Sequence, residues 1–297
     1  MKSSNTFNTV WIIQSIAEGE MKTGTRLYED TFTEIHERHE NLKVYLEQPS
    51  NKREFVECLK KIYSDVKDNK NFPIIHLECH GGKTGLGLAS NEIIEWDELR
   101  GHLIDINFSC GVNLLITIAT CKGVYLIQVA TQLDRAPFYA ILGTDIEVYP
   151  QELITDYKEF YSAYFDTFNT NKALDALNAV IKGEKRSYYF IGAEKIFLNA
   201  FRKYHQDHCT GKAKRKRLED LVSKAMKQPE VNAKGVTWVR NQAKEWFKSE
   251  QGAAFQKYKS RFFGLAEYPH NTERFSISYD DVISHQLQQA IQSPLWC

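Results

Sequence analysis

Two short apolar runs, each followed by a reactive side chain, constrain the fold of this chain more than any other feature. The run Pro73–Glu78 leads into His80, the run at 112–119 leads into Cys121, and a glycine follows each reactive residue closely. Apolar runs of this length that end near glycine predict buried strands. The separation of 41 positions between His80 and Cys121 leaves room for a turn and a helix, as a right-handed crossover requires. We therefore expect adjacent parallel strands with His80 and Cys121 at one sheet edge.

Strand-like and helix-like segments alternate through the first two-thirds of the chain. Strands are expected at 9–16, 43–46, 73–78, 112–119, 138–142 and 187–191, and helices at 25–39, 50–68, 96–103, 124–133, 154–168 and 172–181. This alternation predicts an α/β fold with a mainly parallel sheet flanked by helices. In such sheets ligands bind beyond the carboxyl ends of the strands, where His80 and Cys121 are expected.

The pattern changes after residue 192 to long polar helices, expected at 193–208, 214–227 and 237–262, with a strand at 275–279. Residues 200–263 carry a surplus of ten positive charges, whereas residues 1–199 carry a surplus of seven negative charges. We therefore expect two domains, an α/β domain at 1–192 and a helical, basic C-terminal region at 193–297 packed on it.

Composition limits the classes of protein that the chain can belong to. A hydrophobic content of 42% is sufficient for a full core, and the formal net charge is zero. We find no run near the ~18 apolar residues of a membrane span and no secretory signal. The six cysteines are scattered without the spacing of a disulfide framework. We therefore expect reduced thiols, a cytoplasmic location and no contact with membranes.

A cysteine beside a histidine is the requirement for a thiol nucleophile with an imidazole base. The competing explanation is that the strand-end cysteine is a small buried apolar residue and that the histidine only marks a turn. A zinc site at His76, Cys79 and His80 is a further alternative. Strand alternation argues against it, because Cys79 would face away from both histidines. We expect no metal and no cofactor.

The two motifs together resemble the caspase-like cysteine peptidases, and the CHAT-type branch in particular. The resemblance rests on His80-Gly81, on the segment IIEWDEL at 93–99, and on the sequence ATCKG around Cys121, in that order. It covers roughly residues 8–192. Ala119 stands where caspases carry glutamine and metacaspases carry aspartate, so that position departs from both patterns.

The resemblance implies roles for individual residues. His80 and Cys121 would be the catalytic pair, and the backbone N–H groups of Gly81 and Cys121 would form the oxyanion hole. Asp145 follows the next expected strand and would line a substrate pocket that receives lysine or arginine. The competing explanation for Asp145 is an ordinary loop carboxylate, and Glu78 and Asp134 are further candidates for the pocket role.

The basic run at the start of the second expected C-terminal helix is a candidate contact for an anionic trigger, with a solvated helix face as the ordinary alternative. Its residues are Lys214, Arg215, Lys216 and Arg217. The resemblance implies a cysteine endopeptidase that acts on protein substrates as a regulated effector of bacterial antiviral defence. A partner protein or a nucleotide second messenger would activate it.

Two other functions remain open from the sequence. The first is a catalytically silent caspase-like module that binds a peptide or a nucleotide in the same groove. The second is nucleic-acid binding through the basic block at 200–263. We favour this hypothesis less than an ordinary solvated face, because a basic block is compatible with both.

Overall fold

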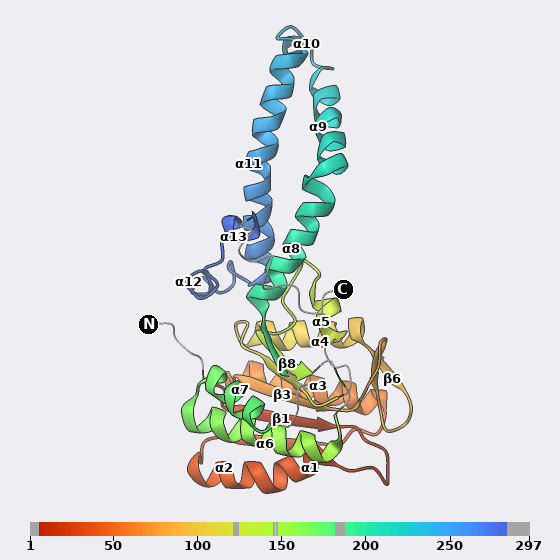
Figure 1. Ribbon diagram of the computed structural model, residues 1–297, viewed down its shortest axis with the longest axis vertical. Coiled ribbons are helices and arrows are strands. Elements are labelled where there is room, and N and C mark those ends of the chain that lie inside the picture. The colour runs from red at the N-terminus through yellow and green to blue at the C-terminus, as the bar shows by residue number, and fades with distance from the viewer. Residues whose placement is uncertain (1–5, 121–124, 145, 147, 182–187, 284–297) are drawn as a thin grey trace. The chain divides into compact units, whose positions relative to one another are not determined.

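The computed structural model describes residues 6–120, 125–144, 146, 148–181 and 188–283. The chain divides into two compact units (Figure 1). The first comprises Met1–Ala130 with Ala136–Ala193, and the second comprises Thr131–Arg135 with Glu194–Cys297. The short segment Thr131–Arg135 therefore belongs with the C-terminal helices, although it lies inside the α/β part of the sequence.

A six-stranded sheet forms the centre of the first unit, and it confirms the predicted α/β class. Its strands, in spatial order, are β2 (Lys43–Glu47), β1 (Thr9–Gln14), β3 (Pro73–Glu78), β7 (Leu115–Ile118), β8 (Ala140–Thr144) and β9 (Tyr188–Gly192). Neighbouring strands are parallel except that β9 runs antiparallel to β8. Every residue of β1, β3 and β7 is buried, as expected for parallel strands covered on both faces.

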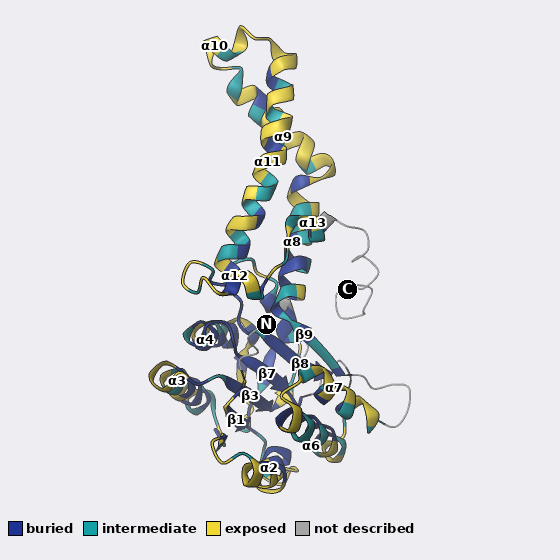
Figure 2. Ribbon diagram, turned by 90° about the vertical axis from the view of Figure 1, so that its left-hand side faces the viewer, coloured by how far each residue is buried: buried dark blue, intermediate teal, exposed yellow. Residues whose placement is uncertain are grey.

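Helices cover both faces of this sheet (Figure 2). One face packs against the continuous helical segment α1 (Thr23–Arg26), η1 (Leu27–Phe32) and α2 (Thr33–Arg38), and against α6 (Pro150–Thr167) and α7 (Thr170–Ala179). The other face carries α3 (Lys52–Asn69) and α4 (Trp96–Ser109), and a short helix, α5 (Leu126–Ala130), contacts α4. Val10, Ile74 and Leu115 pack with Tyr161 of α6 in one buried cluster, so the even-numbered residues of β1 and β3 face α6.

A small antiparallel sheet that the sequence did not predict follows β3. It consists of β4 (His80–Gly81), β5 (Gly85–Gly87) and β6 (Ile93–Glu95). Gly85 allows the close approach of β5 and β6, because a Cβ atom at this position would lie 2.1 Å from the Ile94 carbonyl oxygen. The pairing of His80 with Gly87 holds the backbone of the predicted catalytic histidine in this sheet.

The second unit consists of helices. They are α8 (Ala193–Cys209), α9 (Gly211–Ala225), α10 (Pro229–Asn232), α11 (Val236–Phe262), α12 (Asn271–Arg274) and α13 (Tyr279–Ile283). Helices α9 and α11 pack side by side as an antiparallel pair (Figure 1). Phe197 and Phe201 of α8 contact Phe255 of α11 with ring centroids 5.5 and 5.2 Å apart, so aromatic packing forms the core of this unit.

The predicted strand at 275–279 is wrong. Phe275 stacks on Phe263 with ring centroids 4.2 Å apart, and α13 begins at Tyr279. The backbone N–H and the hydroxyl of Ser278 both donate to the Asp281 carboxylate, at 2.7 and 2.8 Å. This serine-to-aspartate contact is typical of a helix start, and it outweighs the β propensity of the preceding aromatic residues. None of the described helices is long and apolar enough to cross a membrane.

Candidate active site

The His80-Gly81 motif and the motif around Cys121 come directly after β3 and β7, which are neighbouring parallel strands. Leu77 of β3 pairs with Ile118 of β7, and the Ala119 N–H continues the ladder by donating to the Leu77 carbonyl oxygen at 3.0 Å. His80 stands three positions after Leu77, and Cys121 stands three positions after Ile118. Cys121 itself lies outside the described residues, as does Asp145. The strand register therefore brings the segment after β3 and the segment after β7 to the same edge of the sheet. For the second segment this holds as far as Thr120, the last described residue before Cys121.

His80 has one polar side-chain partner among the described residues. Its Nε2 atom lies 2.9 Å from Oε2 of Glu20, and the histidine side chain is 62% exposed. Glu20 lies on the loop between β1 and α1, in a turn that contains Gly19 at φ +90° and in which the Glu20 N–H donates to the Ala17 carbonyl oxygen. With Nε2 engaged by the carboxylate, a neutral His80 presents Nδ1 as its proton acceptor.

A pocket of about 360 Å³ opens beside His80 at this sheet edge. Gly81 and Thr120 line it, together with apolar side chains such as Leu153 of α6. Thr120 is buried, and its hydroxyl has no hydrogen-bond partner among the described residues. The pocket size falls in the ~300–1,000 Å³ range of ligand sites, and its position beyond the strand ends is where α/β sheets bind ligands.

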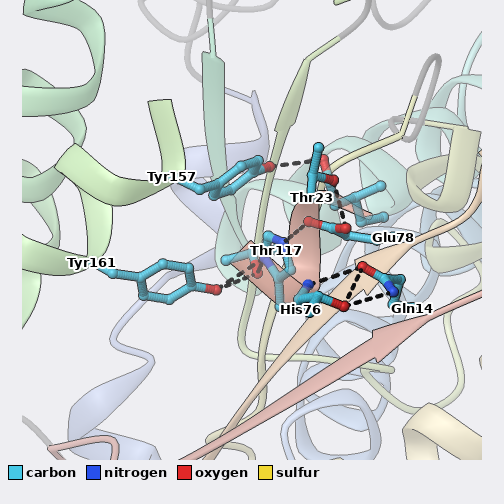
Figure 3. Close-up of polar contacts among 9 residues, drawn as sticks. Gln14, Thr23, His76, Glu78, Thr117, Tyr157 and Tyr161 are labelled. Atoms are coloured by element: carbon cyan, nitrogen blue, oxygen red, sulfur yellow. Dashed lines mark hydrogen bonds and ion pairs between the residues drawn. The ribbon is translucent and has the colours of Figure 1, made fainter. Parts of the chain in front are cut away.

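A buried polar network lies beneath this pocket, centred on His76 and Glu78 of β3 (Figure 3). Nε2 of His76 lies 3.0 Å from Oε1 of Glu78, and the Thr23 hydroxyl of α1 donates to Oε2 of Glu78 at 2.6 Å. On its other side, His76 Nδ1 lies 2.8 Å from the Thr117 hydroxyl and 3.1 Å from the Tyr161 hydroxyl. The network links β3 to β7, α1 and α6 at the edge where both motifs emerge.

Tyrosines of α6 hold this end of β7. The Tyr157 hydroxyl donates to the Ile118 carbonyl oxygen at 2.7 Å, at the last residue of β7. Burial, as the first cause, raises the pKa values of both Tyr157 and Tyr161 well above the ordinary tyrosine value. Both phenols therefore stay protonated and act as hydrogen-bonding groups that set the geometry of the strand end.

Two of the described cysteines near the sheet have thiols that are poor nucleophiles. Burial raises the pKa of Cys79 to about 12 and the pKa of Cys58 to about 11. Cys79 directly follows β3 and is buried. Within the described part of the chain, no group of three His, Cys, Asp or Glu side chains is arranged to hold a metal ion.

The predicted anion contact lies in α9 of the second unit. Lys214, Arg215 and Lys216 are exposed, whereas Arg217 is half-buried. The Lys214 ammonium and the Arg217 guanidinium lie 5.8 and 5.2 Å from the centre of the Phe247 ring on α11. Lys214 and Arg217 therefore pack against the neighbouring helix. Arg215 and Lys216 are the exposed residues of the run without such a ring contact among the described residues. Asp134, the alternative pocket residue, belongs to the second unit.

Sequence reasoning did not find Glu20, because it lies 60 residues from His80 in a turn without a recognisable motif. The nearest sequence signal was Gly19, which favours a turn at that place. Glu78 was considered only as an alternative, although its alternation with His76 and His80 already put the three side chains on one face of the strand.

The chain was compared with known proteins. No family model matches it, and no curated protein matches it.

Proposed function

We propose that this protein is a cysteine endopeptidase whose catalytic pair is His80 and Cys121. The observation that carries the proposal is the pairing of Leu77 with Ile118 on adjacent parallel strands. Because each motif follows its strand after the same number of residues, we expect His80 and Cys121 to leave the sheet at one edge. The pocket lined by His80 and Gly81 supplies a space for substrate there.

The chemistry follows from the two side chains. Cys121 gives its Sγ proton to Nδ1 of His80, and the thiolate attacks the carbonyl carbon of the scissile peptide bond. The carbonyl oxygen becomes an oxyanion that accepts from the backbone N–H groups of Gly81 and Cys121. The C–N bond then breaks while His80 returns the proton to the leaving amine. Water gives a proton to His80 and attacks the thioester, and the thiol leaves with that proton.

The resemblance to CHAT-type peptidases supports a regulated role for this activity. We propose that the enzyme acts on protein substrates as an effector of bacterial antiviral defence. Indiscriminate proteolysis would harm the cell, so activity requires a trigger, which is either a partner protein or a nucleotide second messenger. The solvent-directed cations Arg215 and Lys216 support an anionic trigger, because an exposed basic pair can bind phosphate groups.

A catalytically silent binding module is the second candidate. The observation that favours it is the pocket itself, which combines apolar walls with buried polar groups and would hold a peptide without any chemistry. Such a module would use His80 and Thr120 as contact residues only. It would need no activated thiol at Cys121.

Thiol reactivity separates the two candidates before any substrate is known. In a peptidase, the iodoacetamide alkylation rate of Cys121 rises with pH at a lower midpoint than for a free thiol, and His80→Ala moves that midpoint upward. An unchanged midpoint in His80→Ala would overturn the dyad. Peptide cleavage by triggered protein provides the second measurement, with Cys121→Ala as the variant that must be inactive.

A further inference from the structure

We infer that the pocket beside His80 receives a lysine or arginine side chain of the substrate, with the buried Glu78 carboxylate as its counter-charge. The inference rests on the proposed peptidase function and adds the class of residue that is recognised. It does not rely on Asp145. Glu78 is 3% exposed and lines the pocket.

One hydroxyl and one imidazole contact the Glu78 carboxylate. Thr23 donates a hydroxyl proton to Oε2, and His76 Nε2 faces Oε1. The other ring nitrogen of His76 faces the hydroxyls of Thr117 and Tyr161, either of which can donate to it. A neutral imidazole that donates through Nε2 and accepts at Nδ1 therefore satisfies every contact of the ring. With that tautomer, the Glu78 carboxylate accepts from two neutral donors, the Thr23 hydroxyl and the His76 ring.

None of the described residues that line the pocket is lysine or arginine, so no permanently charged cation among them faces the Glu78 carboxylate. A buried carboxylate is costly unless a cation accompanies it. The cost falls when a cationic ligand enters the pocket and replaces the lost hydration. A neutral or acidic side chain would bring no cation to the carboxylate, so the pocket discriminates by charge.

The walls suit the long stems of basic side chains. Ile16, Met21, Val148 and Leu153 provide apolar surface along the pocket. Lysine and arginine bury their methylene groups against such surface while the charged end seeks a polar partner. The Thr120 hydroxyl, which has no hydrogen-bond partner among the described residues, also lines the pocket and offers a further acceptor for a guanidinium or ammonium group.

The position of the Glu78 carboxylate is set in advance by α1. A Cβ atom at Gly24 would lie 2.9 Å from Oε2 of Glu78 and 2.9 Å from Cγ2 of Ile12. Glycine at this place therefore lets α1 approach the strand end closely, and this brings the Thr23 hydroxyl to the carboxylate. A carboxylate held before binding loses little freedom when a cation arrives, which favours selective recognition.

Binding can be measured without turnover. Calorimetric titration of the Cys121→Ala protein would use N-acetyl-argininamide and N-acetyl-lysinamide as cationic probes. Their neutral counterparts, N-acetyl-citrullinamide and N-acetyl-norleucinamide, serve as controls of similar shape. We expect a cationic probe to bind about tenfold to a hundredfold more tightly than its neutral counterpart. Equal binding, or no binding of either cationic probe, would overturn the inference.

Variants of Glu78 test the counter-charge directly. Glu78→Gln should remove the preference for the cationic probe, whereas Glu78→Asp should retain a reduced preference because the charge remains. Glu18→Gln is the matched control, since Glu18 lies on the neighbouring loop outside the pocket and its replacement changes the net charge equally. Thermal unfolding checks the fold of each variant. If Glu78→Gln does not fold, the Glu78→Asp protein and the paired probes on the parent protein still decide the question.

Cleavage of a peptide series separates this inference from the proposed function. Peptides that differ only before the cut, with arginine, lysine, citrulline, norleucine or aspartate, would be offered to the triggered enzyme. Preference for arginine or lysine that Glu78→Gln abolishes supports the inference. If the enzyme cleaves after citrulline or aspartate as fast as after arginine or lysine, and this cleavage requires Cys121, the peptidase proposal stands and the pocket assignment is wrong. Cation binding without any cleavage supports the pocket and counts against the peptidase.

Discussion

Glu20 and His80 face each other at the edge of the central sheet, with Oε2 of Glu20 2.9 Å from Nε2 of His80. The two residues lie on different segments, Glu20 on the loop after β1 and His80 at the start of β4. A carboxylate at Nε2 favours the tautomer that leaves Nδ1 free to accept a proton, and it stabilises the imidazolium that forms when a thiol is deprotonated. Glu20 is therefore a positioning residue for the proposed base.

Replacing Glu20 should weaken thiol activation. Because imidazolium is less stable without the carboxylate, we expect Glu20→Gln to slow the alkylation of Cys121 near neutral pH by about two- to fivefold, the range for an exposed ion pair. Added salt should reduce the difference between the two proteins. Alkylation rates across pH measure this effect, and Glu18→Gln on the same loop is the control. Identical profiles for Glu20→Gln and the parent protein would show that Glu20 does not act on His80.

The described cysteines should be spared by alkylating reagents in the native state. Cys58, Cys79, Cys110 and Cys209 are all buried. Because burial raises the pKa of Cys79 to about 12, that thiol stays protonated well above the pH at which an exposed thiol ionises, and it reacts only after unfolding. Mass spectrometry of protein treated at about pH 8 should therefore find label on Cys121 and none on Cys79.

The free energy of unfolding should depend on pH because the pKa of Cys79 is raised. The Cys79 thiol has a higher pKa in the folded protein than in the unfolded chain, so it favours the folded state. This contribution is complete at pH values below the pKa of the unfolded chain, and it is lost as the pH rises from that value toward about 12. Chemical denaturation of the parent protein and of Cys79→Ala across alkaline pH would show it, because the variant should lose less stability over this range. Parallel curves would contradict the assignment.

Gly85→Ala should disrupt the small sheet that holds His80. The added Cβ would meet the Ile94 carbonyl oxygen at 2.1 Å, so β5 and β6 must separate. We expect a loss of about 1–3 kcal/mol in the free energy of unfolding and a strong loss of peptide cleavage. Gly101→Ala is the control, because an added Cβ there meets nothing within 4 Å and should stabilise helix α4 by up to about 1 kcal/mol. Chemical denaturation distinguishes the two, and equal stability would refute the close approach.

The basic run of α9 should divide into two functional classes. Reversing Arg215 and Lys216 to glutamate should reduce the response to an anionic trigger without slowing Cys121 alkylation, since both side chains are exposed. Arg217→Ala should instead lower the stability of the second unit by about 1 kcal/mol, because its guanidinium packs over Phe247. Activation assays and thermal unfolding test the two effects separately. An unaltered trigger response after charge reversal would identify the run as a solvated helix face.

Local patterns in the sequence were sufficient for the main architecture. The apolar run Pro73–Glu78 is buried on both faces, so it could only be an internal strand, and the run before Cys121 behaves in the same way. Alternation of such runs with helical segments determined the mainly parallel sheet. The long helices after residue 192 were likewise predictable, because their aromatic residues recur at helical spacing.

Other features depended on contacts between distant residues. The antiparallel direction of β9 and the small sheet around Gly85 arise from partners that a short window of sequence does not contain. The helix start at Tyr279 depends instead on a local contact, that of Ser278 with Asp281. The contact between Glu20 and His80 is the clearest case, since loop conformation brings together groups that have no shared motif. The sequence by itself determined which strands are buried and which reactive residues end them, because burial follows local hydrophobicity. Only the tertiary structure decided which carboxylates face them, because a polar contact depends on where separate segments pack.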